Sequence, residues 1–438
     1  MNTPLEYKPE HAAIAVSTWP GLTPRLLRTD PAPEDLARYV EAGGYQPLTD
    51  TEGLLSAVEL SGIVGRGGAA FPLAVKVRTV RGAWQRGQAT VLVANGEEGE
   101  PASIKDRWLL RHRPHLVLDG LRLAAQLVGA DHVHIYLSDL LGASAVESAL
   151  GELDGGALDG VTAHVRTVHA GYVAGEETAA VRSINGGPAK PSDKPPRPFE
   201  EGVGGLPTMV SNVETLANLP YLHRHGAEQY RSAGTSSSPG TLLLTLTGGG
   251  RPATLYEVPF GVAFTDLLAL HGVSPDTVRG VLMGGYFAGL LNTEVLDVTL
   301  DHENLRRLDS GLGCGAISLM TDECPVAVAA AVLAYFDREN AGQCGSCFNG
   351  TAAMAAVGEA LRDGVAGSDD LARLERWSVV LRGRGACATL DAATNAAASL
   401  LRKFPAEVAR HLENHCDTCG EQAFRAERPF EAEAVNPT

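Results

Sequence analysis

The chain has 438 residues, enough for two to four domains, and its 44% hydrophobic and 20% charged residues are typical of a globular protein, not a disordered or fibrous one. A net charge of −16 argues against a general binder of nucleic acids or anionic membranes. The longest strongly apolar run, Cys324 to Phe336, is too short to span a bilayer, so we expect no direct membrane insertion.

The N-terminal sequence MNTPLEYKPEHAA lacks the basic region and apolar run of a secretory signal, so we expect a cytoplasmic protein. In a reducing compartment, the seven cysteines are better candidates for metal or redox chemistry than for disulfides. Glycine is the compositional outlier: its 50 residues are about 11% of the chain, against about 7% in average proteins.

After a lead-in of short helical pieces, residues 61–220 have an α/β pattern. Residues 91–95 and 132–137 are short, apolar and rich in β-branched residues, which predicts buried strands, and residues 113–130 between them have helical periodicity. A strand, a helix and a strand in this order predict a parallel βαβ unit of a Rossmann-like sheet. We expect this domain to extend over residues 1–235, lead-in included. Within it, the Pro- and Gly-rich residues 185–208 are either a functional loop or a surface linker.

Two further domains are expected. The flexible stretch 231–240 precedes a predicted β-hairpin, a short helix and another strand, so residues 236–320 are expected to form a small α+β module. Four helical stretches follow with short breaks between them, so residues 321–438 are predicted to form a helical bundle with a cysteine-containing tail.

Three motifs of the first domain are suited to binding a cofactor. The glycine-rich segment 61–77 lets backbone N–H groups approach phosphate oxygens, although its spacing matches neither the Walker A nor the dinucleotide pattern. Segment 91–115 is a strand that ends in an asparagine and an acidic turn, and segment 169–187 repeats this pattern with a tyrosine before its acids. Because ligands bind beyond the carboxyl ends of strands in an open α/β sheet, both are candidate ligand sites; a tight turn or a solvated acidic turn is the alternative.

The cysteines form a second kind of motif. Cys344 and Cys347 open a helix, Cys387 follows, and Cys416 and Cys419 lie near the C-terminus. Two C-x2-C pairs fit a four-ligand zinc site, whereas an iron–sulfur cluster would recruit Cys387.

These motifs in this order resemble the NADH-binding flavoprotein subunit of respiratory complex I and its relatives in soluble hydrogenases and formate dehydrogenases. The matching segments are GRGGAAFP, NGEEGEPASIKDR with RHRPH, GYVAGEETA, KPPRPFEEGVGGLPTMVSNVETLANLP and CGSCFNG, and they span roughly residues 60–405. The resemblance implies a Rossmann-like FMN domain, a ubiquitin-like β-grasp module and a C-terminal helical bundle that carries an iron–sulfur cluster.

The resemblance also implies residue roles. Residues that would bind the flavin or the nucleotide are Gly65, Arg66, Gly67, Gly68, Phe71, Lys76, Asn95, Glu97, Glu98, Glu100, Tyr172, Gly175, Glu176, Glu177, Lys194, Asn212 and Thr215. Of these, Glu98, Tyr172 and Glu177 would be catalytic. The implied function is oxidation of NADH or NADPH through FMN and an iron–sulfur cluster, with a ferredoxin or a thioredoxin-like iron–sulfur subunit as partner.

The chain departs from the family pattern at the cluster. The family has three cysteines spaced C-x2-C-x2-C, and here the first is Ala341, which leaves Cys344, Cys347 and Cys387. They would hold a [3Fe-4S] cluster or a [4Fe-4S] cluster with an unusual fourth ligand. Cys416 or Cys419 would complete the site, form a second metal site, or do neither.

The second departure concerns the nucleotide. Phe71 is kept, but two other aromatic positions that stack on adenine in the family are Thr79 and Arg197 here. This change leaves NADPH open as donor, as well as an electron-transfer protein that has lost nicotinamide binding and exchanges electrons with ferredoxin. A non-enzymatic zinc-binding scaffold is a third hypothesis. The basic residues of the helix after the acidic turn are either a docking face or a solvated face: Lys105, Arg107, Arg111 and Arg113.

Overall fold

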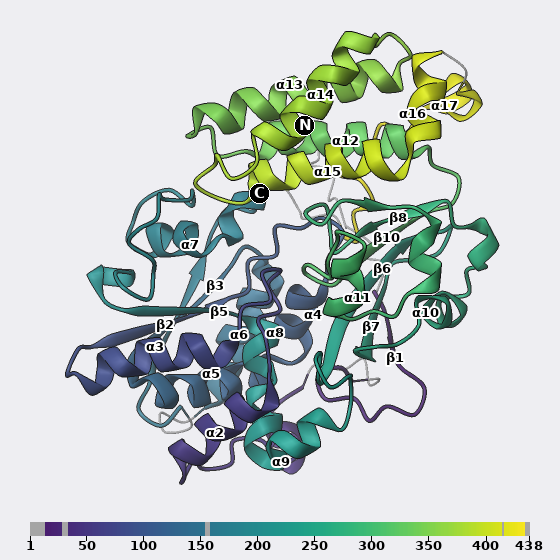
Figure 1. Ribbon diagram of the computed structural model, residues 1–438. Helices are drawn as coiled ribbons and strands as arrows, with labels where there is room; N and C mark the ends of the chain where they lie inside the picture. The colour runs from purple at the N-terminus through teal and green to yellow at the C-terminus, as the bar shows by residue number, and fades with distance from the viewer. Residues whose placement is uncertain (1–13, 29–33, 154–157, 414–415, 434–438) are drawn as a thin grey trace, which may run out of the picture.

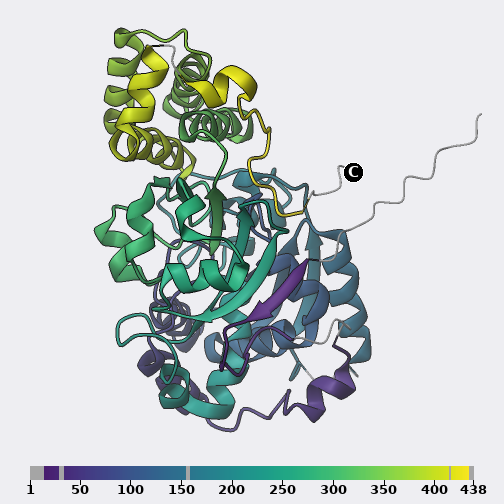
Figure 2. The same cartoon turned by 90° about the vertical axis from the view of Figure 1, so that its right-hand side faces the viewer.

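The computed structural model describes residues 14–28, 34–153, 158–413 and 416–433. Two β-sheets lie side by side, and a layer of C-terminal helices lies at one end of the molecule, where it packs on the second sheet (Figures 1 and 2). The mixed α/β class predicted from the sequence is confirmed. Among the described residues, no helix combines the length and the apolar character needed to cross a lipid bilayer.

The first sheet is parallel, with the strand order β4-β3-β2-β5. Its strands are β2 (Thr90–Asn95), β3 (Ala130–Leu137), β4 (Thr162–Thr167) and β5 (Thr208–Asn212). Along β2, Leu92 packs into the main core with α5, and the next residue, Val93, packs on the opposite face with Ala180 of α7. Helices therefore cover both faces of the sheet, which is why its central strands are apolar on both sides.

Local sequence explains where the helices of this part begin and end. Helix α5 begins with Pro114, which lacks an N–H that would need a partner, and ends at Gly129 in the left-handed conformation with φ of 70°. The helices around the first sheet are α1 (Leu36–Glu41), α2 (Thr51–Ser61), α3 (Leu73–Gln85), α4 (Lys105–His112), α5 (Pro114–Val128), α6 (Leu140–Glu152), α7 (Glu177–Ile184), α8 (Val213–Ala217) and α9 (Leu219–Arg231).

The second sheet has the order β1-β7-β6-β10-β8-β9. Its strands are β1 (Ala15–Thr18), β6 (Thr241–Gly248), β7 (Thr254–Pro259), β8 (Gly280–Met283), β9 (Leu290–Leu291) and β10 (Ala316–Met320), and its helices are α10 (Phe264–His271) and α11 (His302–Arg307). The predicted hairpin is the antiparallel pair β6–β7, and β10 lies parallel to β6. Strand β1 pairs with β7, so the N-terminal lead-in extends to the second sheet instead of staying with the first domain.

The C-terminal part is helical. Its helices are α12 (Pro325–Glu339), α13 (Gly345–Arg362), α14 (Ser368–Val380), α15 (Thr389–Lys403), α16 (Pro405–Leu412) and α17 (Asp417–Gln422). The last apolar stretch is two helices because Pro405 interrupts it. After α17, the chain leaves the helical layer and runs back toward the first sheet (Figure 2).

Candidate functional site

A cavity of about 570 Å³ opens at the carboxyl ends of β2 and β5. The chain passes from β2 to β3 and β4 on one side, whereas β5 lies on the other side of β2, so the strand order reverses at this point. In the register of the two strands, Asn95 pairs with Asn212, and both side chains line the cavity. Ligands of open α/β sheets bind at such a reversal, and the volume is in the range of small-molecule sites.

The glycine-rich segment forms one wall. The loop is closed by a hydrogen bond from Gly65 N to Phe71 O at 2.8 Å, and Gly68 has φ of +115°, a conformation that favours glycine. The cavity is lined by predicted residues of this segment, Gly65, Gly67, Gly68, Phe71 and Lys76. Lys76 Nζ donates to Val210 O at 2.9 Å, and burial lowers the pKa of its ammonium group.

Arg66 corrects one prediction. Its guanidinium is absent from the cavity lining and lies against the second sheet instead, where Nη2 donates to Thr241 O at 3.1 Å and Nε is 3.9 Å from a Glu214 carboxylate oxygen. Only its backbone N–H serves the cavity wall, by donating to Thr215 Oγ1 at 2.9 Å. The resemblance implied that Arg66 binds the flavin or the nucleotide, whereas the contacts of its guanidinium are to Glu214, Thr241 and Tyr230.

The acidic turn after β2 has three carboxylates in different environments. Glu97 is 7% exposed, its Oε2 finds no hydrogen-bond partner in the described part of the chain, and burial raises its pKa to about 7. Burial also raises the pKa of Glu100 to about 7, although Tyr286 N donates to it at 3.0 Å. Glu98 accepts hydrogen bonds from the backbone N–H groups of Asp106 and Arg107 at the start of α4. All three line the cavity, and Glu98 also holds α4 in place.

Backbone contacts keep the floor of the cavity tight. Asn95 Nδ2 donates to Gly175 O at 2.8 Å, and a Cβ on Gly175 would lie 2.9 Å from Glu97 O. Tyr172 lies edge-on to the ring of Phe336, and burial raises the pKa of its phenol. Tyr172 and Gly175, which are predicted to bind the flavin or the nucleotide, both line the cavity.

A network of charges lies in the cavity wall next to the glycine-rich segment. Glu177 has Lys76 and Arg197 at 3.9 Å and Lys194 at 3.8 Å, and Lys194 also pairs with Glu176 at 2.6 Å. Three cations face two carboxylates, so this wall has a net positive charge that suits the phosphates of a nucleotide. Lys194 and Arg197 come from the Pro- and Gly-rich segment 185–208, which therefore contributes directly to the cavity.

The last two predicted residues come from β5 and α8. Asn212 Nδ2 donates to Asp106 Oδ2 at 2.7 Å, and Asn212 Oδ1 accepts from Glu214 N at 3.0 Å. Thr215 lies in the cavity wall with Asn212.

Neither interpretation of the basic helix was correct. Lys105, Arg107 and Arg113 are between 1% and 8% exposed. Lys105 pairs with Glu214 at 3.0 Å and Arg113 with Glu34 at 2.9 Å. Arg111 is partly exposed and pairs with Asp139 at 2.6 Å. These ion pairs hold α4 in place, so the four residues form neither a free docking face nor a solvated face.

The cysteine motif lies next to the cavity. Cys344 is the N-cap of α13, as predicted, and Cys344, Cys347 and Cys387 line one small pocket together with Ala341. Ala341, which occupies the position of a cysteine ligand in the family, therefore faces the three cysteines. Segment 185–208 supports this loop, since Lys190 Nζ donates to Ala341 O at 2.8 Å.

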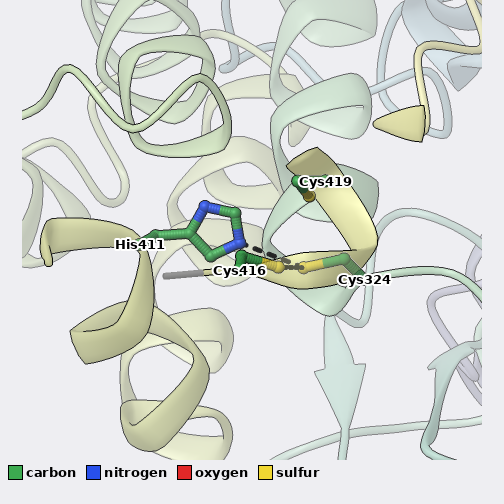
Figure 3. Close-up of side chains that lie close together, drawn as sticks. All are labelled: Cys324, His411, Cys416 and Cys419. Atoms are coloured by element: carbon green, nitrogen blue, oxygen red, sulfur yellow. Dashed lines mark hydrogen bonds between the residues drawn. The ribbon is translucent and has the colours of Figure 1, made fainter. Parts of the chain in front are cut away.

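Cys416 and Cys419 do not complete this set. Their thiols lie with Cys324 and His411 in a separate group (Figure 3). Of the three alternatives for the tail cysteines, completion of the cluster by Cys416 or Cys419 is therefore wrong for this structure. The spacing His-x4-Cys-x2-Cys is present in the sequence, but a pattern of cysteines alone does not include His411, and Cys324 lies far from the tail.

Several cavity residues were missed by sequence reasoning. Phe199 lies two positions after Arg197 and provides an aromatic ring in the cavity wall. Two adenine-stacking aromatic residues of the family are replaced here by Thr79 and Arg197. Four more come from the loops that follow β8 and precede β10, whose contribution no local motif indicates: Gly284, Phe287, Gly313 and Cys314.

Comparison with known proteins agrees with this geometry. Residues 58–221 match the family model of the Nuo51 FMN-binding domain, and residues 327–411 match the NADH-ubiquinone oxidoreductase-F iron-sulfur binding region. The F 2 subunit of the NADH-quinone oxidoreductase of Rhizobium meliloti is 31% identical over 413 residues, which are 89% of this chain and 98% of the relative. The HndC subunit of the NADP-reducing hydrogenase of Solidesulfovibrio fructosivorans is 29% identical over 87% of this chain and 81% of the relative.

A solved structure is also similar. The NAD+-reducing [NiFe]-hydrogenase in its H2-reduced state superposes with a TM-score of 0.77 and 32% identity, over 83% of this chain and 63% of the hydrogenase chain. The fold and the two adjoining sites define a flavin and iron–sulfur oxidoreductase subunit. More specifically, the chain belongs to the family of the FMN-binding F subunits of NADH-quinone oxidoreductase.

The residues present fit FMN. The cavity offers a glycine loop for close backbone approach, a wall with a net positive charge for phosphate, and one buried carboxyl oxygen of Glu97 that lacks a partner among the described residues. The three thiols beside the cavity fit an iron–sulfur cluster, because thiolates are its usual ligands.

Proposed function

We propose that this chain oxidises a reduced nicotinamide nucleotide and passes the electrons through FMN and an iron–sulfur cluster to a protein acceptor. FMN, when bound, supplies the conversion of a two-electron hydride transfer into one-electron steps, whereas the protein supplies binding, orientation and potential. The family membership and the adjoining sites support this function.

One observation carries the proposal. Cys387 lines the large cavity and also the small pocket of Cys344 and Cys347. A flavin in the cavity and a cluster on these thiols would therefore have a common wall. Such an arrangement gives electrons a short route that stays inside the protein.

We assign roles to the flavin-site residues on this basis. Gly65, Gly67 and Gly68 would bind the flavin phosphate and ribityl chain with Lys76, and Asn95 and Glu97 would face the ring. Tyr172 and Glu177 are proposed to contact the reacting rings. Glu98 is given a positioning role, because its carboxylate is already engaged by the backbone of α4.

The cluster is proposed to be held by three thiolates. Ala341 faces the same pocket, and its methyl group cannot ligate iron. This leaves a [3Fe-4S] cluster, or a [4Fe-4S] cluster whose fourth ligand does not come from residue 341.

The cavity residues near the expected adenine position are compatible with both NADH and NADPH as donors. Thr79 and Arg197 line the cavity, and Phe199 provides a ring near the position of Arg197. The carboxylate of Glu177 disfavours a 2′-phosphate, whereas the net positive charge of Lys76, Lys194 and Arg197 favours one. We expect the Thr79→Phe variant to bind its nicotinamide nucleotide, NADH or NADPH, about tenfold more tightly than the parent protein does, because an added aromatic ring can stack on adenine.

We propose that the acceptor is an iron–sulfur protein, either a ferredoxin or a thioredoxin-like subunit, and that the chain works in the cytoplasm. The relatives are named as subunits of larger oxidoreductases. We also propose a division into an FMN domain, a β-grasp module and a helical iron–sulfur domain near residues 235 and 320. In support, the β6–β7 hairpin, α10 and the parallel placement of β10 beside β6 are the features expected of a β-grasp.

Anaerobically purified full-length protein tests the proposal. We expect the visible absorbance bands of a flavin and a cluster, and we expect NADH or NADPH, added separately, to bleach the flavin bands. If FMN is bound and neither nucleotide at millimolar concentration bleaches it, the chain does not oxidise nicotinamide nucleotides, and the ferredoxin hypothesis replaces this one. If neither flavin nor iron is present and only zinc is found, the redox function is wrong.

A further inference from the structure

A group of metal-binding side chains lies away from the cavity and from Cys344. Cys324 precedes α12, His411 lies at the end of α16, and Cys416 and Cys419 lie at the start of α17. Their ligand atoms all lie within 4.8 Å of one another. The imidazole of His411 points toward the thiols of Cys324 and Cys416 (Figure 3), with Nε2 3.2 Å from Cys324 Sγ.

We propose that these four side chains bind one structural zinc ion. Zinc binds thiolates at about 2.3 Å and imidazole at about 2.0–2.1 Å, so a tetrahedral site places two sulfurs about 3.8 Å apart. The sulfurs of Cys324 and Cys416 are 3.8 Å apart. A four-iron cluster places each thiolate on a different iron across the cube, so its ligands stand farther apart than those of a single ion. The spacing of this group therefore favours a single metal ion.

The hydrogen bonding of His411 also suits a metal ligand. Nδ1 lies 2.8 Å from the backbone oxygen of Leu361, which can only accept, so Nδ1 carries the proton. Nε2 then carries the lone pair, which is directed at the thiol of Cys324. Histidine ligands of metals are usually oriented in this way, by a hydrogen bond from the second ring nitrogen to a carbonyl or carboxylate. His411 is 2% exposed, so water does not compete for this position.

The zinc site would anchor the segment that follows it. After α17, the chain crosses from the helical layer to the first sheet (Figure 2), where Ala432 N donates to Pro101 O at 2.9 Å. Glu433 then pairs with Arg107 at 3.3 Å and with Arg111 at 2.9 Å. Arg107 in turn pairs with Glu98 of the cavity at 3.4 Å. A metal ion at the start of this segment would limit its conformational freedom and so stabilise its attachment beside the cavity.

The metal content of the whole protein tests the site. We expect anaerobically purified full-length protein to contain one zinc per chain besides its iron, and zinc X-ray absorption to show three sulfur ligands and one nitrogen ligand. This measurement needs no variant. Wild-type protein without zinc, zinc with a different ligand set, or iron in the place of zinc would overturn the proposal.

Two variants distinguish this site from the cluster. Cys416→Ser combined with Cys419→Ser is expected to lose the zinc, to keep FMN and iron, and to become sensitive to limited proteolysis after residue 412. Cys344→Ser is the matched control, and it is expected to lose iron and keep zinc. If the tail variant loses iron and keeps zinc, the two assignments are reversed and the proposal fails. Since zinc binding requires neither flavin nor nucleotide, failure of the proposed function would leave these outcomes unchanged.

Discussion

Replacing Glu97 by glutamine should make folding less sensitive to pH. The Glu97 carboxyl is buried, and its pKa is raised from 4.5 to about 7. The folded protein therefore binds more protons than the unfolded chain between these values, and this group lowers stability as the pH rises through that window. The two pKa values correspond to about 3 kcal/mol of unfolding free energy, all of it expressed above about pH 7. Glutamine does not ionise, so the Glu97→Gln variant should be more stable than the parent at about pH 8 and nearly equal at about pH 4.5.

Urea unfolding of the flavin-free protein measures this difference. Tryptophan fluorescence is a suitable probe, because Trp108 is 6% exposed and lies in the helix that follows the acidic turn. Glu100 has a raised pKa too, but it is present in both proteins, so its contribution cancels in the comparison. Glu147→Gln, on the exposed side of α6, is the matched control and should have no effect at any pH. A stability difference that is constant from about pH 5 to about pH 8, or a variant that is less stable at high pH, would refute the reasoning.

Three further variants test the site. Gly175→Ala should weaken FMN binding about tenfold, because the new Cβ would lie 2.9 Å from Glu97 O, so the acidic turn in the cavity wall must shift, at a cost of about 1–3 kcal/mol. Flavin fluorescence titration checks this, and an unchanged Kd would contradict it. Cys387→Ser should lower the iron content and leave FMN bound, and equal iron in variant and parent would remove Cys387 from the cluster. Arg66→Ala should lower the unfolding free energy by about 1.5–3 kcal/mol, because it removes the hydrogen bonds of the buried guanidinium to Thr241 O and to the Tyr230 hydroxyl. If it abolishes FMN binding without affecting stability, the side chain acts on the cofactor after all.

Local sequence patterns were sufficient for much of the fold. The apolar, β-branched runs predicted β2 and β3, and the helical periodicity between them predicted α5. These predictions succeed because one strand or helix is determined mainly by its own residues and their spacing. The same holds for Cys344 and Cys347, whose short spacing places both at the start of one helix.

The types of residue that line the candidate cavity could be predicted from the sequence, whereas the orientation of their side chains could be predicted less well. The glycine loop and the acidic turn follow strands or precede helices, so their position at the sheet edge could be inferred. Whether a charged side chain turns toward the ligand depends on the buried groups around it. Arg66 turns to Glu214, and Lys105 also pairs with Glu214, because an unpaired charge inside a protein is costly.

By itself, then, the sequence determined the α/β class, a ligand site at the carboxyl ends of the parallel strands, and a three-cysteine motif with alanine at the first position of the family pattern. Only the tertiary structure decided which distant groups meet. Cys324 and Cys416 are 92 positions apart, yet their sulfurs are neighbours. Spacing along the chain reveals partners that share a helix or a turn, whereas partners on different elements are brought together by the packing of the whole core. For this reason the tail cysteines could be assigned to Cys324 and His411 only after the helices α12 and α16 were placed.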